Sequence, residues 1–336
     1  MNNRERFRAV LHHQMPDDRL PVIEWATWWD LTLERWRQEG LAPELEGDAL
    51  FQSLNLDVHR QYWFGDMGPE CPQPARYGAG IMEDEDDYER IRPLLYTDGC
   101  NQDLLRQMRE AEPVHQAGEI VTWYTLNGGF WFPRMLFGIE NHLYSFYDYP
   151  ELYHRILDDL ADYHVKLLEK IYEIGTPEFM TLAEDMSYNN GPMLSEEMFD
   201  EFVAPYYRRI IPIIHTHGTK VIVDSDGDVT KMVPWLEREG VDGILPLEYQ
   251  AGVNLVQLRK DHPNFLMLGG FNKMIMKDGE EAMRKEFERI LPVMRSGGYI
   301  PGVDHQTPPD VSLKTYHVSL RLLHEYAEKA VQGCRI

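Results

Sequence analysis

The sequence predicts a single (β/α)8 barrel of the TIM type with a helical extension at its amino terminus. Three observations favour this class. Short apolar runs alternate with amphipathic helical stretches over nearly the whole chain, eight of the runs have the length of a strand, and no linker rich in Pro, Gly or Ser interrupts them. One domain is therefore expected over residues 1–336.

The eight expected strands are short, rich in apolar or β-branched residues, and bounded by turn-forming or polar residues. In chain order they cover residues 20–25, 56–62, 119–125, 179–184, 220–223, 243–247, 265–268 and 298–302. Their alternation with helices requires parallel strands that are joined by right-handed crossovers.

The expected helices carry recognisable start and stop residues. Pro150 opens one helix, an apolar stripe of helical period follows, and Gly175 ends it. Ser195 is expected to cap the next helix. Pro212 is expected to kink or restart a helix over residues 206–217.

Charge and composition exclude several classes of partner. The formal net charge of −23 argues against nucleic acid and anionic membranes as ligands. The chain has neither a signal peptide nor an apolar run of the roughly 18 residues that a membrane helix needs, so a cytoplasmic protein is expected. The three cysteines are too scattered for a disulfide framework or a thiolate metal site, and the acidic run at residues 83–87 indicates a solvated loop or a helix start.

Two aspartates stand one residue apart where an expected strand ends. Asp224 and Asp226 follow the run 220–223, at the end of the sheet where barrel enzymes place their active sites. Two such carboxylates repel each other unless they share a cation or a proton, so we interpret them as functional. Asp228, in contrast, is expected to cap a helix over residues 229–239.

Other polar residues follow other expected strands and should meet at the same mouth. The side chains expected to face it are Glu24, Asp57, Asp185, Asp224, Asp226, Glu248, Asp304 and His305. Aromatic side chains near these strand ends are expected to wall it: Trp25, Trp28, Trp29, Trp123, Trp131 and Phe132. His215 and His217 belong elsewhere, since the end of a helix at the opposite face of the barrel accounts for them without a metal.

The order of motifs from Asn2 to Tyr326 resembles the uroporphyrinogen decarboxylase-like superfamily. The motifs that carry the resemblance lie at residues 3–10, 16–22, 183–185, 194–202, 205–207, 269–272 and 298–310. The resemblance implies the barrel fold, and it implies either a decarboxylase or one of the methyltransferases that serve corrinoid proteins or methylate thiols.

Decarboxylases of the superfamily carry an Arg-Gln-Ala-Gly-Arg-Tyr segment early in the barrel, which this chain replaces with residues 21–30. An acidic cavity without those arginines should repel an octa-anionic porphyrinogen. In the methyltransferase branch zinc is bound by a His-x-Cys pair and a later Cys. Here Asp224, Asp226, Glu248 and His305 occupy the corresponding places, and both cysteines are missing.

The implied metal site is therefore rich in oxygen, which suits Zn, Mn, Co or Fe, with zinc first, and favours activation of an oxygen substituent over a thiol. The resemblance thus implies a methyltransferase that demethylates a small methoxylated or N-methylated compound and passes the methyl group to a separate corrinoid protein. Asp57-Val-His59 lacks the glycine of a corrinoid-binding motif, so the corrinoid must come from that partner. Barrels of this superfamily often pair, which allows a homodimer.

The resulting candidate site has three parts. The candidate metal ligands are Asp224, Asp226, Glu248 and His305, which with Asp185 are also the candidate catalytic residues. The candidate substrate-binding residues are Glu24, Trp28, Tyr188, Asn189 and Asp304. Two alternatives stay open: a metal-free lyase or decarboxylase with Asp224 and His305 as acid and base, and a non-catalytic barrel that binds a small molecule.

Overall fold

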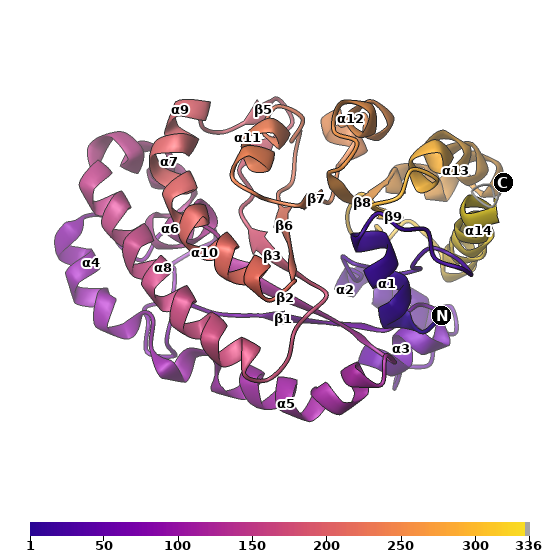
Figure 1. The fold of residues 1–336 in the computed structure, drawn as a ribbon, viewed down its shortest axis with the longest axis horizontal. Helices are drawn as coiled ribbons and strands as arrows, with labels where there is room; N and C mark the ends of the chain where they lie inside the picture. Colours follow the sequence, from indigo (N-terminus) through magenta and orange to yellow (C-terminus); the bar gives the residue numbers. More distant parts are fainter. Residues whose placement is uncertain (333–336) are drawn as a thin grey trace.

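The computed structural model describes residues 1–332, and at its centre lies a curled sheet of seven parallel strands (Figure 1). The strands are β1 (His59–Trp63), β2 (Val121–Asn127), β3 (Phe179–Ala183), β6 (Lys220–Asp224), β7 (Gly243–Leu245), β8 (Leu266–Phe271) and β9 (Tyr299–Val303). They lie side by side in chain order, and each pair is parallel. The fold is TIM-barrel-like, as predicted.

The first predicted strand, residues 20–25, is not a strand. Its backbone groups are used elsewhere: Leu20 N donates to Ala327 O, and Val22 N donates to the carboxylate of Asp57 at 2.9 Å. Pro21 has no N–H to give to a ladder. The segment nevertheless fills the gap between β9 and β1, because Asp57 N donates to Val22 O and the Trp25 indole donates to Val303 O.

Helices connect the strands and cover the outside of the sheet (Figure 1). Before β1 lie α1 (Asn3–Leu11), α2 (Asp30–Gln38) and α3 (Gly47–Ser53). Between β1 and β3 follow α4 (Glu85–Ile91), α5 (Gln102–Gln116), α6 (Trp131–Phe137), α7 (Ile139–Asp148) and α8 (Pro150–Tyr172). The second half contains α9 (Glu196–Met198), α10 (Ala204–Thr216), α11 (Val233–Arg238), α12 (Leu255–Asp261), α13 (Glu280–Met294) and α14 (Leu313–Gln332).

The predicted helix signals have mixed outcomes. Pro150 opens α8, and Ser195 Oγ accepts from Met198 N, as expected. The acidic run forms the start of α4, where Asp84 is the N-cap. Pro212, however, lies within a continuous α10 and does not restart it.

The predicted helix over 229–239 is shorter, because a turn precedes α11. Asp228 therefore caps that turn, through Thr230 N, and not the helix itself. Within residues 1–332 no helix combines the length and apolar character that a membrane span needs. The prediction of one domain over 1–336 stays a prediction, since its last four residues, with Cys334, lie outside the described part.

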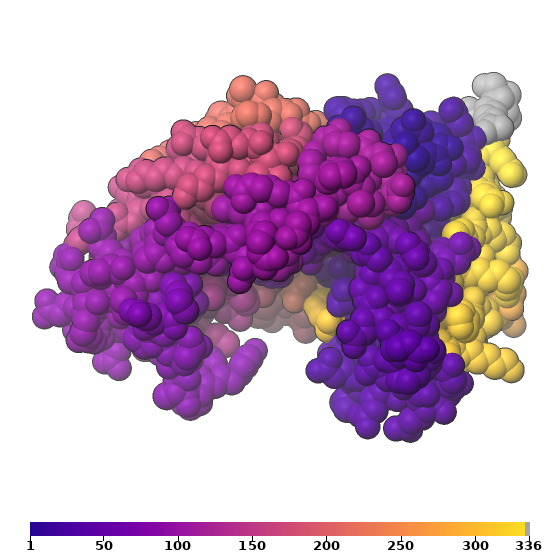
Figure 2. All heavy atoms as spheres, turned by 90° about the horizontal axis from the view of Figure 1, so that it is seen from below, coloured from indigo at the N-terminus to yellow at the C-terminus, as the bar shows by residue number. Residues whose placement is uncertain are grey.

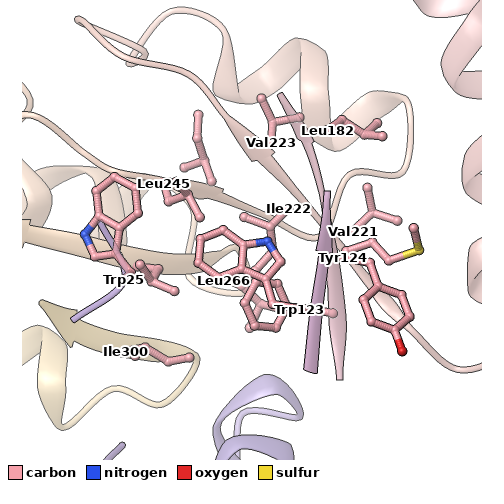
Figure 3. Packing of buried hydrophobic residues seen from close by; sticks show 14 of the residues in the cluster. Trp25, Trp123, Tyr124, Leu182, Val221, Ile222, Val223, Leu245, Leu266 and Ile300 are labelled. Atoms are coloured by element: carbon pink, nitrogen blue, oxygen red, sulfur yellow. The ribbon is translucent and has the colours of Figure 1, made fainter. Parts of the chain in front are cut away.

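The barrel interior is apolar at its base and becomes polar toward the carboxyl ends of the strands. Figure 3 shows Trp25 and Trp123 among aliphatic side chains of β6, β7, β8 and β9, all of them buried. One layer higher, Thr125 and Thr181 face each other at 2.7 Å and accept hydrogen bonds from Gln61 and Trp123. Because side chains alternate along a strand, Asp224 points to the same side of β6 as Ile222.

Candidate active site

A cavity of about 290 Å³ opens at the carboxyl ends of the strands. Its lining residues come from early and late parts of the chain: Trp25, Ala26, Thr27, Gln61, Trp63, Trp123, Asp185, Asp224, Asp226, His305 and Gln306. Figure 2 shows the molecule hollowed between an indigo lobe and a purple lobe, both from the first third of the chain. Barrel enzymes place their catalytic residues at the carboxyl ends of the strands, where this cavity opens.

Backbone packing fixes the loop that carries Asp224 and Asp226. Gly227 has φ of +84°, and a Cβ added there would come within 2.6 Å of the Tyr188 backbone, so glycine is required. Asp228 N donates to Tyr188 O, and Gly227 N donates to Glu248 Oε2 at 2.8 Å. The loop after β6 is thereby tied to the hairpin of β4 (Ser187–Tyr188) and β5 (Gly191–Pro192) on one side and to Glu248 on the other.

Asp185 is held beside this loop in a strained conformation. Its φ of +48° lies in the left-handed region, which a residue other than glycine adopts only when its surroundings impose it. Its Oδ1 accepts from Asp226 N at 3.4 Å, and its Oδ2 lies 3.8 Å from Arg134 Nη1. Strain of this kind concentrates at functional sites, which favours the predicted role of Asp185.

The neighbouring Glu184 is buried and faces away from the cavity lining. Its carboxylate accepts from Gly129 N and Phe130 N at the start of α6 and from the Tyr207 hydroxyl. Burial raises the pKa of Glu184 to about 7 although these hydrogen bonds oppose the shift. Glu184 thus anchors α6, the helix that carries Arg134, to the end of β3.

Asp226 and His305 form a facing acid and imidazole pair. His305 Nε2 lies 3.7 Å from Asp226 Oδ2, and the Trp25 ring stands edge-on to the imidazole, with 6.2 Å between ring centroids. Burial, followed by the charge of Lys273, lowers the pKa of His305. The lowered pKa favours the neutral imidazole, whose Nε2 faces the carboxyl group of Asp226.

The carboxylates at the mouth hold protons unusually tightly. Burial, and then the charges of Asp185 and Glu248, raise the pKa of Asp226 to about 7. Burial also raises the pKa of Asp185, and it raises that of Asp224 well above the ordinary range, with help from its two acidic neighbours. The mouth carries an excess of acid that a proton or another cation must neutralise.

The other predicted site residues lie around the cavity without lining it. Asp304 is buried and accepts from Tyr249 N and Lys273 N, and burial raises its pKa to about 6. Glu24 accepts from Tyr316, and Trp28 lies in the core between Trp36, Phe51 and Tyr316. Tyr188 ends β4 and Asn189 begins the turn to β5, and both are exposed.

Asp57 is a correction, because it does not face the mouth. It precedes β1, which begins at His59, and so lies at the amino end of the sheet. There it accepts a bidentate hydrogen bond from Arg19 at 2.6 and 2.7 Å. His215 likewise lies at the amino end, where it pairs with Asp242 at 2.7 Å.

The four predicted metal ligands do not form a coordination set in the arrangement observed. Within residues 1–332 no group of three or more His, Cys, Asp or Glu side chains is placed to hold a metal ion. Asp226 and His305 stand as a pair, while Glu248 uses Oε2 for the Gly227 amide. The divalent ion stays a prediction.

Sequence reasoning missed several residues of the cavity. Gln61 and Trp63 line it, although the strand that contains them was expected to end at residue 62, one residue too early to include Trp63. Arg134 and Lys273, the cations nearest to the carboxylates, were not foreseen either. Arg134 and Lys273 lie near the carboxylates because of the conformation of the chain after β2 and β8, which the sequence pattern does not reveal. Trp63 could have been identified as a cavity residue because it is a tryptophan at the end of a strand.

Comparison with known proteins places the whole chain in one structural group. Residues 126–326, more than half of the chain, match the family model of uroporphyrinogen decarboxylase (URO-D). No curated protein sequence matches the chain. A methyltransferase from Methanosarcina mazei has a similar solved structure, with a TM-score of 0.66 and 14% identity over 97% of this chain and 99% of that one.

A second solved structure is more distant. The putative vitamin-B12 independent methionine synthase from Listeria monocytogenes aligns over 94% of this chain and 98% of that one, with a TM-score of 0.43 and 10% identity. At these identities the structural likeness concerns the fold alone.

Proposed function

This chain belongs to the uroporphyrinogen decarboxylase family, and on that premise we propose that it is a methyltransferase. It removes a methyl group from a small methoxylated or N-methylated compound and passes it to a separate corrinoid protein. The observation that carries the proposal is the cavity at the carboxyl ends of the strands, where an acid and imidazole pair meets a wall of tryptophans.

The size and charge of the cavity separate this activity from that of the family's namesake. About 290 Å³ holds a small molecule, whereas a porphyrinogen with eight carboxylates is far larger. Three aspartates line the cavity, and their charge would repel such an anion. The likeness in fold to the Methanosarcina mazei methyltransferase supports the same choice.

The residues at the mouth have distinct roles in the proposed reaction. Asp226, whose pKa is about 7, donates a proton to the oxygen or nitrogen that loses the methyl group, which makes that atom a better leaving group. His305 exchanges this proton with Asp226, and Asp185 together with Arg134 orients the Asp226 carboxyl group. Trp25, Trp63 and Trp123 shape the pocket and exclude water.

The partner's corrinoid supplies a strong nucleophile for the methyl group when it is bound. Trp63 and Asp226 of the cavity wall have side chains that are 45% and 41% exposed, so a partner can approach the substrate. A divalent ion, zinc first, held by Asp224, Asp226, Glu248 and His305 in place of the proton on Asp226, and a homodimer are further parts of the proposal. Elemental analysis and sedimentation, respectively, test them.

A metal-free lyase remains a second candidate, and the paired Asp226 and His305 favour it. In that case the pair acts as acid and base on a carbon acid without any methyl acceptor. The two functions differ in their co-substrate, because only the methyltransferase needs a reduced corrinoid. A non-catalytic barrel would show neither activity.

The test incubates the purified protein with a panel of methoxylated and N-methylated compounds, with and without cob(I)alamin as methyl acceptor. We expect mass spectrometry to show a demethylated product only when the acceptor is present. Asp226→Ala and His305→Ala should fold normally and lower the rate by about 100-fold or more. Product formation without the acceptor, or full activity in both variants, would overturn the proposal.

A further inference from the structure

We propose that the cavity at the mouth selects a small organic cation, a methylated ammonium group, as the part of the substrate that it binds. The inference rests on the proposed function. It narrows the proposed substrates from methoxylated or N-methylated compounds to N-methylated compounds. It is carried by the cavity wall, which combines the exposed ring of Trp63 with three aspartates whose charges are incompletely compensated.

The tryptophans of the wall have no N–H to offer to a ligand. The indole of Trp25 donates to Val303 O at 2.7 Å, that of Trp63 to Asn127 Oδ1 at 3.0 Å, and that of Trp123 to Thr181 Oγ1 at 2.7 Å. These bonds fix the three rings. Trp123 is stacked on His59 and Phe179, and Trp63, which is 45% exposed, presents the aromatic surface of the wall. Such surface attracts cations through the negative face of the ring.

The polar side chains of the wall are partly committed. The Thr27 hydroxyl donates to Ala26 O, the Gln306 amide donates to the same carbonyl, and the Gln61 amide donates to Thr125 Oγ1. Each glutamine amide has a second N–H, and the oxygen atoms of these side chains are acceptors. The His305 ring is the exception, and it stands beside Asp226.

Three half-buried aspartates complete the wall and lack full compensation. Asp185 lies 3.8 Å from the Arg134 guanidinium, and Asp226 lies 3.7 Å from the His305 imidazole, whose pKa is lowered. Within residues 1–332 the carboxylate of Asp224 receives no hydrogen bond and no ion pair. Carboxylates in this state bind a proton unless a cation replaces it.

An organic cation fits both halves of this wall, because the aspartates supply negative charge and Trp63 supplies aromatic surface. A methylated ammonium group spreads its charge over its methyl groups, so it contacts tryptophan faces and carboxylates without needing hydrogen bonds. If its nitrogen is quaternary, transfer breaks one C–N bond and leaves the electron pair on nitrogen. The leaving group is then a neutral tertiary amine, and the corrinoid nucleophile of the partner takes the methyl group.

Calorimetric titration of chelator-treated protein at pH 8 tests the inference with two isosteric probes. Choline carries a trimethylammonium group, and 3,3-dimethylbutan-1-ol carries a neutral tert-butyl group of the same shape. We expect choline to bind at least about tenfold more tightly, which equals about 1.4 kcal/mol. Equal affinities, or binding of the neutral alcohol alone, would overturn the inference.

Two tryptophan variants locate the binding. Trp63 lines the cavity and is 45% exposed, and Trp29 is 46% exposed but does not line it. Trp63→Leu should weaken choline binding by about tenfold, Trp63→Phe by less, and Trp29→Leu not at all. Equal losses in Trp63→Leu and Trp29→Leu would place choline outside the cavity and end the proposal.

The titration needs no methyl acceptor, so its failure differs from a failure of the proposed function. Choline binding without methyl transfer would support the cation site and contradict the proposed methyltransferase activity. Demethylation of a methoxylated compound by a protein that does not bind choline would support the methyltransferase activity and contradict the cation site.

Discussion

The two ends of the barrel treat their acids in opposite ways. At the amino end an aspartate or glutamate stands one or two residues before a strand, and each one has basic partners. Asp57 pairs with Arg19, Glu178 with Arg4 and His115, and Asp242 with Lys220 and His215. At the carboxyl end three half-buried aspartates lie at or just after strand ends, Asp185, Asp224 and Asp226, and within residues 1–332 Asp185 alone of them forms an ion pair with an arginine or lysine, at 3.8 Å.

The difference appears in the acidity of the two groups. Burial alone would raise the pKa of Glu178 and Asp242, but hydrogen bonds from their cationic partners outweigh it and lower the pKa of both. At the mouth nothing outweighs burial, so the pKa values of the aspartates rise. The lesson is that charge satisfaction, more than residue type, separates structural acids from candidate functional ones.

The largest effect on stability is expected from an acid of the amino end. Asp57→Ala should lower the free energy of unfolding by about 3 to 5 kcal/mol, because it leaves the Arg19 guanidinium and the Val22 amide without their acceptor. Urea unfolding measures the change. Asp158→Ala, at an ion pair whose aspartate is 77% exposed, is the control and should change it by less than about 1 kcal/mol. Equal changes would remove the distinction between buried pairs and surface pairs.

An acid of the mouth should behave in the opposite way. Asp226→Asn should lower the rate of the proposed reaction by about 100-fold or more, since the amide cannot donate a carboxyl proton. Its unfolding free energy at pH 8 should stay the same or increase, because a repelled carboxylate has been removed. A large loss of stability would show that Asp226 is a structural residue like Asp57.

The pH dependence of stability should reveal the acids of raised pKa. Burial raises the pKa of Glu24 to about 8 in the folded chain from an ordinary value of 4.5. The folded state therefore binds the proton more tightly, and this contribution is complete below about pH 4.5 and is lost as the pH rises through about 8. Each such group lowers the unfolding free energy by up to about 1.4 kcal/mol per pH unit in that window.

Urea unfolding between pH 5 and pH 9 checks this prediction. Glu24→Gln should flatten the curve relative to the wild type, and Glu281→Gln, on an exposed residue, should leave it unchanged. If stability instead rises with pH across the window, the predicted direction for Glu24 is wrong.

The smallest effect on stability is expected from a metal. If the mouth acids share a divalent ion, protein purified without chelator should contain close to one zinc per chain. Its removal should lower the melting temperature by only a few degrees while it abolishes turnover. Zinc well below one equivalent, together with unchanged activity after chelation, would leave a shared proton as the means of neutralisation.

The sequence alone determined the fold class and four of the acids and imidazoles that line the cavity, Asp185, Asp224, Asp226 and His305. Apolar runs of strand length located all seven strands of the sheet to within a few residues, because burial on both faces requires such runs in a parallel sheet. The family resemblance is confirmed. Asp224 and Asp226 were found because a doublet of acids at a strand end is unusual, and Trp25 and Trp123 were correctly expected to wall the cavity.

Only the tertiary structure decided which acids are compensated. Strand 20–25 failed because Asp57 captures the Val22 amide, a contact between residues 35 positions apart that no local pattern encodes. The neighbours of each carboxylate, Arg19 for Asp57 and Arg134 for Asp185, come from distant segments. Electrostatic compensation depends on distances of a few ångströms across the fold, and the one-dimensional spacing of residues does not contain them.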